Sequence, residues 1–292
     1  MSLSAILILL LAALMHALWN SLAKVARDSG AFIWCLVAVS SGFLIPVSLW
    51  LSWGRALPSW GVALALVSGV AQAAYFISLG RAYMGGDLSI VYPLSRSIAL
   101  LLLPVVAFLF LGERLRPMGF AGIGSVLVGI YVLQMQDVSL ASLTKPLRAL
   151  AQRPQLWAIA TGMCTMLYSA IDKAGMKTGL HPLVYYNACT LVVLAVLAPR
   201  ALANRHAIGE EWRRSWWRII LSGLLMPASY GLALYIMSLK EGAASYVLAV
   251  RQVSVVLGVI IGSLVLREPY GGIRLIGGTF IFLGVVLIGL AR

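Results

Sequence analysis

The chain has 292 residues, of which 61% are hydrophobic and 11% are Asp, Glu, Lys or Arg, against roughly 25% charged residues in an average soluble domain. This composition excludes a soluble globular protein, because so little polar surface would not keep the chain in solution. The formal net charge of +13 does not indicate nucleic-acid binding, because the basic residues lie between apolar runs instead of on one face or tail.

Apolar runs long enough to cross a bilayer follow one another along the chain. A spanning helix needs about 20 apolar residues. No charge precedes Lys24, so the first run lacks the positive segment of a signal peptide, and we expect it to remain as a helix. The longest connections are about 136–154 and 201–215. The sequence predicts an all-α membrane protein with ten transmembrane helices, at about 3–23, 31–52, 60–82, 88–111, 117–135, 155–174, 182–200, 216–239, 244–266 and 271–291.

The two halves of the chain share a residue pattern. The segment Leu18–Lys24 parallels Leu167–Lys173 at an offset of 149 residues. Further along the offset is 155, and the matching pairs are Arg96 and Arg251, Glu113 and Glu268, Gly122 and Gly277, and Gly129 and Gly284. Each half then holds five spans, and because five is odd, the second half crosses the membrane in the opposite sense. We expect two inverted five-helix repeats, 1–135 and 155–292, joined by 136–154, with a binding site near the midplane between them.

A family resemblance rests on short motifs in three spans. They are His16-Ala17-Leu18-Trp19-Asn20, Tyr92-Pro93-Leu94-Ser95-Arg96, Gly112-Glu113 and Arg267-Glu268. With the ten-span layout, they make nearly the whole chain similar to the drug/metabolite transporter superfamily, with two EamA-type domains. The resemblance implies a ten-helix exporter or importer of metabolites and leaves the substrate open. We expect an integral protein of a bacterial inner membrane, monomeric or homodimeric.

Arg96 and Arg251 are charges placed deep in the predicted spans. A charge at that depth costs ~2.5–3.5 kcal/mol on insertion scales, so it is first interpreted as functional. The two spans enter from opposite faces, so both guanidiniums can approach the midplane, where they would suit a carboxylate, phosphate or phosphonate. The alternative is structural, with each arginine paired to a carboxylate or to helix carbonyls. The acidic residues considered as partners all lie near predicted span ends: Asp87, Glu113, Asp172, Glu241 and Glu268.

His16 and Asn20 are four residues apart and therefore share one helical face. Because histidine changes charge near neutral pH, His16 is a candidate for proton coupling, and Asn20 is a candidate substrate contact. The alternative for His16 is a hydrogen bond to a neighbouring helix. Asp172 beside Lys173 is the second coupling candidate, and its alternative is a solvated ion pair at the end of a span.

Aromatic residues are the remaining candidates for substrate contact. Trp19 and its repeat partner Tyr168 lead this group, together with Tyr92, because such rings stack on substrates or surround an amine. The alternative is that they pack the bundle or anchor it at the interface. Four further tyrosines belong to the same group: Tyr75, Tyr230, Tyr235 and Tyr246.

The predicted function is secondary transport, by alternating access, of a small anionic or zwitterionic metabolite such as an amino acid or phosphonate. The sequence has no P-loop, dinucleotide-binding glycine pattern, HExxH or Gly-x-Ser-x-Gly, so we expect no enzyme activity, cofactor or metal. One alternative is a flippase for a lipid-linked head group. The other is a membrane-embedded enzyme, which would need paired acids or a histidine cluster at one depth.

The membrane orientation is left open by two conflicting indications. Lys and Arg are more numerous near the odd-numbered connections, so the positive-inside rule places both termini outside. The family resemblance implies termini in the cytoplasm.

Overall fold

The computed structural model confirms the all-α class. It describes residues 2–86, 91–92, 94–96, 98–99, 102, 117–133, 135, 152–239, 247, 250–251, 253–261 and 271–290. Within these ranges the helices are α1 (Leu3–Lys24), α2 (Ser29–Ser52), α3 (Ser59–Gly85), α5 (Pro117–Leu133), α7 (Arg153–Met176), α8 (Pro182–Ala203), α9 (Arg205–Ser238), α11 (Val253–Ile260) and α12 (Gly271–Leu290).

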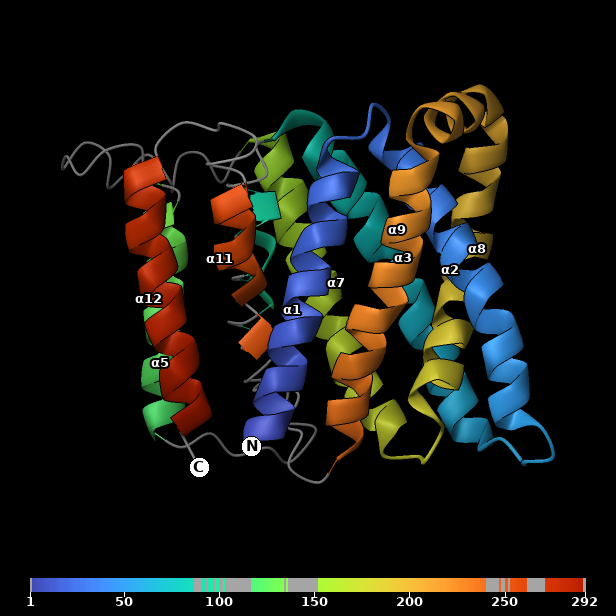
Figure 1. Ribbon diagram of the computed structural model, residues 1–292, viewed down its shortest axis with the longest axis horizontal. Coiled ribbons are helices and arrows are strands. Elements are labelled where there is room, and N and C mark those ends of the chain that lie inside the picture. The colour runs from blue at the N-terminus through green and yellow to red at the C-terminus, as the bar shows by residue number, and fades with distance from the viewer. Residues whose placement is uncertain are drawn as a thin grey trace.

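Each described helix overlaps a predicted span, although α9 begins at Arg205, well before the predicted span 216–239. Five described helices, α1, α2, α3, α8 and α9, are long and apolar enough to cross a membrane. α11 lies inside the predicted ninth span, whereas most of the predicted fourth span, 88–111, lies outside the described residues. In Figure 1 the helices stand side by side, and α1 begins at the same lower edge at which α12 ends.

The two faces of α1 differ in polarity: the outward face is apolar, and the inward face carries the polar residues. Its outward face carries a leucine stripe that is 39–69% exposed: Leu3, Leu7, Leu11, Leu14 and Leu18. Its inward face buries His16, Trp19 and Asn20. Polar residues in a membrane bundle face the interior, because lipid offers them no hydrogen bonds. The polar residues of α1 therefore mark the side of the helix that faces the functional interior.

The predicted connection 201–215 lies almost entirely within helices. α8 continues to Ala203 and α9 begins at Arg205, with a kink at Ser215, where φ is −132° and ψ is 19°. The segment before the kink, 205–214, is rich in charge, and a helix at the membrane interface solvates charged side chains while its backbone stays bonded. It contacts the α1–α2 connection, where Glu211 Oε2 accepts from the Asp28 backbone N–H at 3.1 Å.

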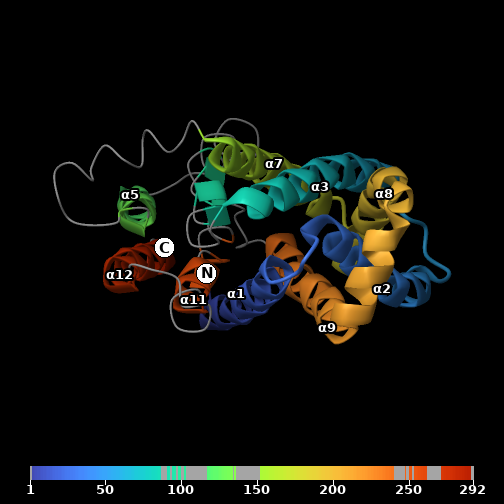
Figure 2. The ribbon, with the colours of Figure 1, turned by 90° about the horizontal axis from the view of Figure 1, so that it is seen from above.

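Four helix pairs make the largest contacts that bear on the predicted repeat, which stays a prediction. α3 packs on α7, and its repeat equivalent α9 packs on α1, the equivalent of α7. α2 packs on α8, and α5 packs on α12, so these two pairs join equivalent helices of the two halves. Figure 2 shows α5 beside α12 at one end of the bundle and α1 beside α9 nearer its centre. This set of pairs is the one that a twofold relation between the halves requires.

Glycine contacts between α5 and α12 show the direction in which these two helices run relative to each other. A Cβ added to Gly129 would lie 2.5 Å from the Gly277 carbonyl oxygen, and one added to Gly284 would lie 2.5 Å from that of Gly122. The glycines allow the close packing that the sequence predicts. Gly129 contacts the earlier residues of α12, whereas Gly284 contacts the earlier residues of α5, so the two helices run antiparallel.

Lys24 and Lys173, which match in the predicted repeat, each donate to backbone carbonyl oxygens at the end of another helix. Lys24 Nζ donates to the carbonyl oxygens of Tyr83 and Gly86 at 3.2 and 2.9 Å, at the end of α3. Lys173 Nζ donates to the carbonyl oxygen of Met237 at 2.8 Å, at the end of α9. A lysine at a helix C-terminus bonds the last carbonyls and offsets the negative end of the helix dipole. Each lysine thereby ties the first helix of its repeat to the third.

Candidate functional site

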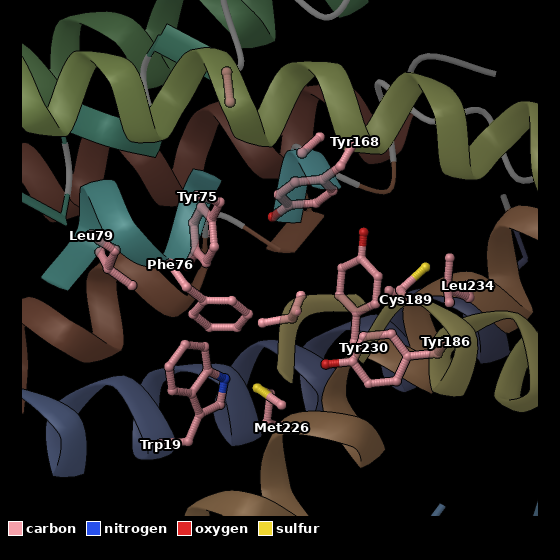
Figure 3. Close-up of a cluster of buried hydrophobic side chains, with 14 of the residues drawn as sticks. Trp19, Tyr75, Phe76, Leu79, Tyr168, Tyr186, Cys189, Met226, Tyr230 and Leu234 are labelled. Carbon is pink, nitrogen blue, oxygen red and sulfur yellow. The ribbon is translucent and has the colours of Figure 1, made fainter. Parts of the chain in front are cut away.

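An aromatic cavity lies in the core between helices of both halves. It is small, and its lining residues are His16, Trp19, Gln72, Tyr75, Phe76, Tyr168, Tyr186, Met226 and Tyr230. Figure 3 shows the rings of Trp19, Tyr75, Tyr168 and Tyr230 gathered around one centre. Edge-to-face contacts order them, with ring centres 5.6 Å apart for Tyr75 and Tyr168 and 5.9 Å for Tyr168 and Tyr230. The structure thus places the repeat partners Trp19 and Tyr168 on the same cavity.

His16, on α1, joins the two arginines. The Arg96 guanidinium contacts His16 Nε2, and Arg251 Nη2 lies 3.2 Å from His16 Nδ1. The Trp19 indole N–H also donates to His16 Nδ1, at 3.1 Å. Both arginines are buried, at 3% and 4% exposure. Two guanidiniums from opposite halves of the chain therefore meet on one imidazole.

This cluster has more donors than acceptors. A neutral imidazole accepts at one nitrogen and donates at the other, whereas guanidinium and indole groups only donate. Three donor groups thus surround a ring that can accept at one nitrogen. Arg251 Nε is also buried and has no acceptor in the described part of the chain. A buried donor without a partner costs about 1–3 kcal/mol, and more when charged. An anionic group would supply the missing acceptors.

Each arginine guanidinium also makes a cation–π contact with the face of a tyrosine ring. The Arg96 guanidinium carbon lies 5.3 Å from the Tyr92 ring centre, and that of Arg251 lies 5.2 Å from the Tyr230 ring centre. The Tyr92 hydroxyl is held at 2.7 Å from Ser254 Oγ. In the described part of the chain neither arginine forms an ion pair with a carboxylate, the structural alternative considered from the sequence. Among the described residues, the two guanidiniums contact the His16 imidazole and the tyrosine rings, which are not carboxylates.

Asp172 is placed differently from the sequence expectation, and a solvated ion pair at the end of a span was the wrong interpretation. Its side chain is fully buried. Oδ1 accepts from the Ser68 hydroxyl and from the Tyr185 hydroxyl at 2.9 Å, and Oδ2 accepts from the Tyr230 hydroxyl. Burial arises because α7 continues to Met176 and because α3, α8 and α9 each place a hydroxyl against the carboxylate. Tyr230 therefore contacts both Asp172 and Arg251.

Several candidates are not among the residues that line the cavity: Arg96, Arg251, Tyr92, Asp172, Asn20 and Tyr235. Asn20 is used within the protein, because its Nδ2 donates to the His16 carbonyl oxygen at 2.9 Å and its Oδ1 accepts from the Tyr83 hydroxyl at 3.1 Å. It holds α1 against α3 and is not a lining residue. Tyr235 is 48% exposed and points away from the core. The candidates outside the described residues are Asp87, Glu113, Glu241, Tyr246 and Glu268.

Six residues of the cavity and of the Asp172 network were not among the candidates: Ser68, Gln72, Phe76, Tyr185, Tyr186 and Met226. Ser68 and Gln72 carried a usable signal, since they lie four residues apart and form one polar face of an otherwise apolar span. The two tyrosines follow Pro182 closely at the start of α8, where aromatic residues usually anchor a helix at the interface. Their sequence position gave no sign of their burial.

Comparisons with known proteins agree with this architecture. Residues 152–290 match the EamA-like transporter family. The Spermidine export protein MdtI of Cronobacter sakazakii (strain ATCC BAA-894) is 32% identical over 105 residues, which are 35% of this chain and 91% of that protein. The crystal structure of another protein, 17% identical in sequence, superposes with a TM-score of 0.68 over 99% of both chains, which shows a shared fold.

Proposed function

This chain belongs to the drug/metabolite transporter superfamily, and on that premise we propose that it is a secondary transporter of a small anionic or zwitterionic metabolite. We place it in a bacterial inner membrane, with repeats 1–135 and 155–292 moving against each other in alternating access. The observation that carries the proposal is the meeting of two buried arginines on His16, with fewer acceptors than donors among the described residues.

The chemistry of the arginine pair favours a carboxylate, phosphate or phosphonate. Guanidinium presents a planar fork that bonds two oxygens at once, and charge-assisted bonds of this kind are roughly twice as strong as neutral ones. His16, which both arginines contact, lines the aromatic cavity, so an anionic group held by the arginines would lie beside it. The surrounding tyrosine and tryptophan rings can cover an apolar or amine-bearing remainder.

A polyamine fits this site poorly, although the relative MdtI is named a spermidine exporter. A polyamine carries only positive charge and hydrogen-bond donors at neutral pH. The arginine pair already carries two positive charges and more hydrogen-bond donors than His16 can accept. A polyamine would therefore be repelled and would supply no acceptor. The substrate of this chain therefore differs in charge from that relative's named substrate.

Of the two coupling candidates, the geometry supports Asp172 over His16 as the proton carrier. A proton added to His16 would place a third positive charge between two guanidiniums and remove the acceptor nitrogen. A proton added to the buried Asp172 would neutralise a charge that is costly at membrane depth. Tyr230, which contacts Asp172 and Arg251, provides the path by which protonation alters the substrate site.

The test is uptake of labelled amino acids and alkylphosphonates by proteoliposomes. Arg96→Lys and Arg251→Lys keep the charge but lose the planar fork. Loss of a buried charge-assisted contact costs ~2–5 kcal/mol, or roughly 30- to 4,000-fold in affinity at about 1.4 kcal/mol per decade. Arg213→Lys, at an exposed position, is the matched control. Folded Arg96→Gln and Arg251→Gln proteins with unchanged transport kinetics would overturn the proposal.

A further inference from the structure

A second cavity opens at the end of the bundle where α2 begins and α8 ends, the upper edge in Figure 1. Its walls come from α2, α3, α8 and the first residues of α9. Phe76 stands between this cavity and the aromatic cavity and belongs to the lining of both. The arginine pair, His16 and Asp172 do not line it, so it is a site of its own.

The mouth of the cavity is cationic. Arg81 and Arg200 both line it, and within the described ranges neither forms an ion pair with a carboxylate. The Arg81 guanidinium carbon lies 4.4 Å from the Trp157 ring centre, which holds the group in place without neutralising it. Asp28 also lines the cavity, but its carboxylate accepts from the Ala31 backbone N–H at 2.9 Å and caps α2. The lining thus carries two cations and one carboxylate that is already bonded.

Trp34 adds an unsatisfied donor to the same lining. Its indole N–H is buried and has no acceptor in the part of the chain that the structure describes. Such a donor carries an energetic penalty that an acceptor on an occupant would remove. Together with the arginines and Asn204, it makes the polar part of the cavity rich in donors.

The deeper wall of the cavity is apolar, with Ile33, Phe76, Ile77 and Leu197 among its residues. The α9 segment beside the mouth bears three exposed tryptophans: Trp212, Trp216 and Trp217. Exposed tryptophans near a kink between a charged segment and an apolar helix mark the depth of the membrane–water interface. The cations therefore lie at head-group depth, and the apolar wall extends toward the acyl chains.

We propose that this cavity binds an anionic phospholipid, with the phosphate on Arg81 and Arg200 and the upper acyl chain along the apolar wall. Basic pockets between transmembrane helices are suited to anionic head groups. A bound lipid would join α2, α3 and α8 to segment 205–214. Binding is measured without transport, so the proposal stands or falls independently of the transport function.

The experiment compares lipids that differ only in head group. Purified full-length protein in a neutral detergent is titrated with short-chain phosphatidylglycerol, with phosphatidylcholine of the same acyl chains, and with glycerol 3-phosphate. We expect phosphatidylglycerol to bind at least about tenfold more tightly than the other two, a difference of about 1.4 kcal/mol. Equal affinity of the two lipids would overturn the proposal. Equally tight binding of glycerol 3-phosphate would make this a soluble-anion site and would also overturn it.

Two substitutions locate the binding. Arg200→Glu should weaken phosphatidylglycerol binding by about tenfold or more and leave phosphatidylcholine binding unchanged. Arg200 is exposed, so its substitution does not disturb the core. Arg55→Glu makes the same change at an exposed position in the α2–α3 connection, at the opposite edge of the bundle, and should have no effect. Wild-type phosphatidylglycerol affinity in the Arg200→Glu protein would refute the assignment.

Discussion

Replacing Tyr230 by phenylalanine isolates one bond in the buried polar network. The Tyr230 hydroxyl donates to Asp172 Oδ2, and both side chains are buried. A hydrogen bond to a charged group contributes ~1.5–3 kcal/mol, and the phenylalanine ring preserves the contact with Tyr168 at 5.9 Å. Tyr230→Phe should therefore destabilise the protein by about 1.5–3 kcal/mol, with little change in packing.

The same substitution at Tyr75 is the matched control. The Tyr75 ring also packs on Tyr168, at 5.6 Å, but its buried hydroxyl has no hydrogen-bond partner in the described part of the chain. Tyr75→Phe removes an unsatisfied polar group, so stability should stay the same or rise. The assay is thermal unfolding of both purified variants and wild type in one detergent at one pH. Equal losses for the two variants would refute the reasoning, as would an unchanged Tyr230→Phe protein.

Three further predictions follow from other parts of the fold. Gly129→Ala should cost about 1–3 kcal/mol, because its Cβ meets backbone of α12, whereas Gly124→Ala has open space and should not destabilise; equal melting temperatures would contradict this. Gly179→Ala should cost about 1–2 kcal/mol in thermal unfolding, because Gly179 has φ of +80°, and an unchanged melting temperature would count against the turn geometry. Asp172→Asn should retain substrate exchange in proteoliposomes and lose the dependence of uptake on a pH gradient; persistent pH-driven accumulation would exclude Asp172 as the proton carrier.

The helices were predictable because lipid imposes a length and a composition on each of them. The expected and observed ends of α1 and α2 agree closely for that reason. The charged segment 205–214 was assigned to a connection between spans, and its low hydropathy gave no sign that it is the first part of helix α9. The repeat was visible because the same glycines and charges recur at fixed offsets, and the reciprocal contacts of Gly129 and Gly284 follow from it.

The site was predictable only in part. Arg96 and Arg251 were visible because charges are rare in membrane spans and because they are repeat equivalents. Their meeting on His16 was not, since it depends on how separate helices pack. The depth of Asp172 was misjudged because the inward face of α7 is polar, so the apolar run seems to end before the helix does. The sequence shows which residues are unusual for a membrane span, whereas the contacts between these residues depend on how the helices pack.

The central claim is that the arginine pair holds an anionic group, and ligand binding tests it most directly. Purified wild-type protein and the Arg251→Gln variant are screened by thermal shift and calorimetry with amino acids, alkylphosphonates and spermidine. The account predicts that an amino acid or phosphonate stabilises the wild type by mass action, that Arg251→Gln weakens its binding by roughly 30-fold or more, and that spermidine does not stabilise either protein. Stabilisation of both proteins by spermidine, with no response to any anionic ligand, would contradict it.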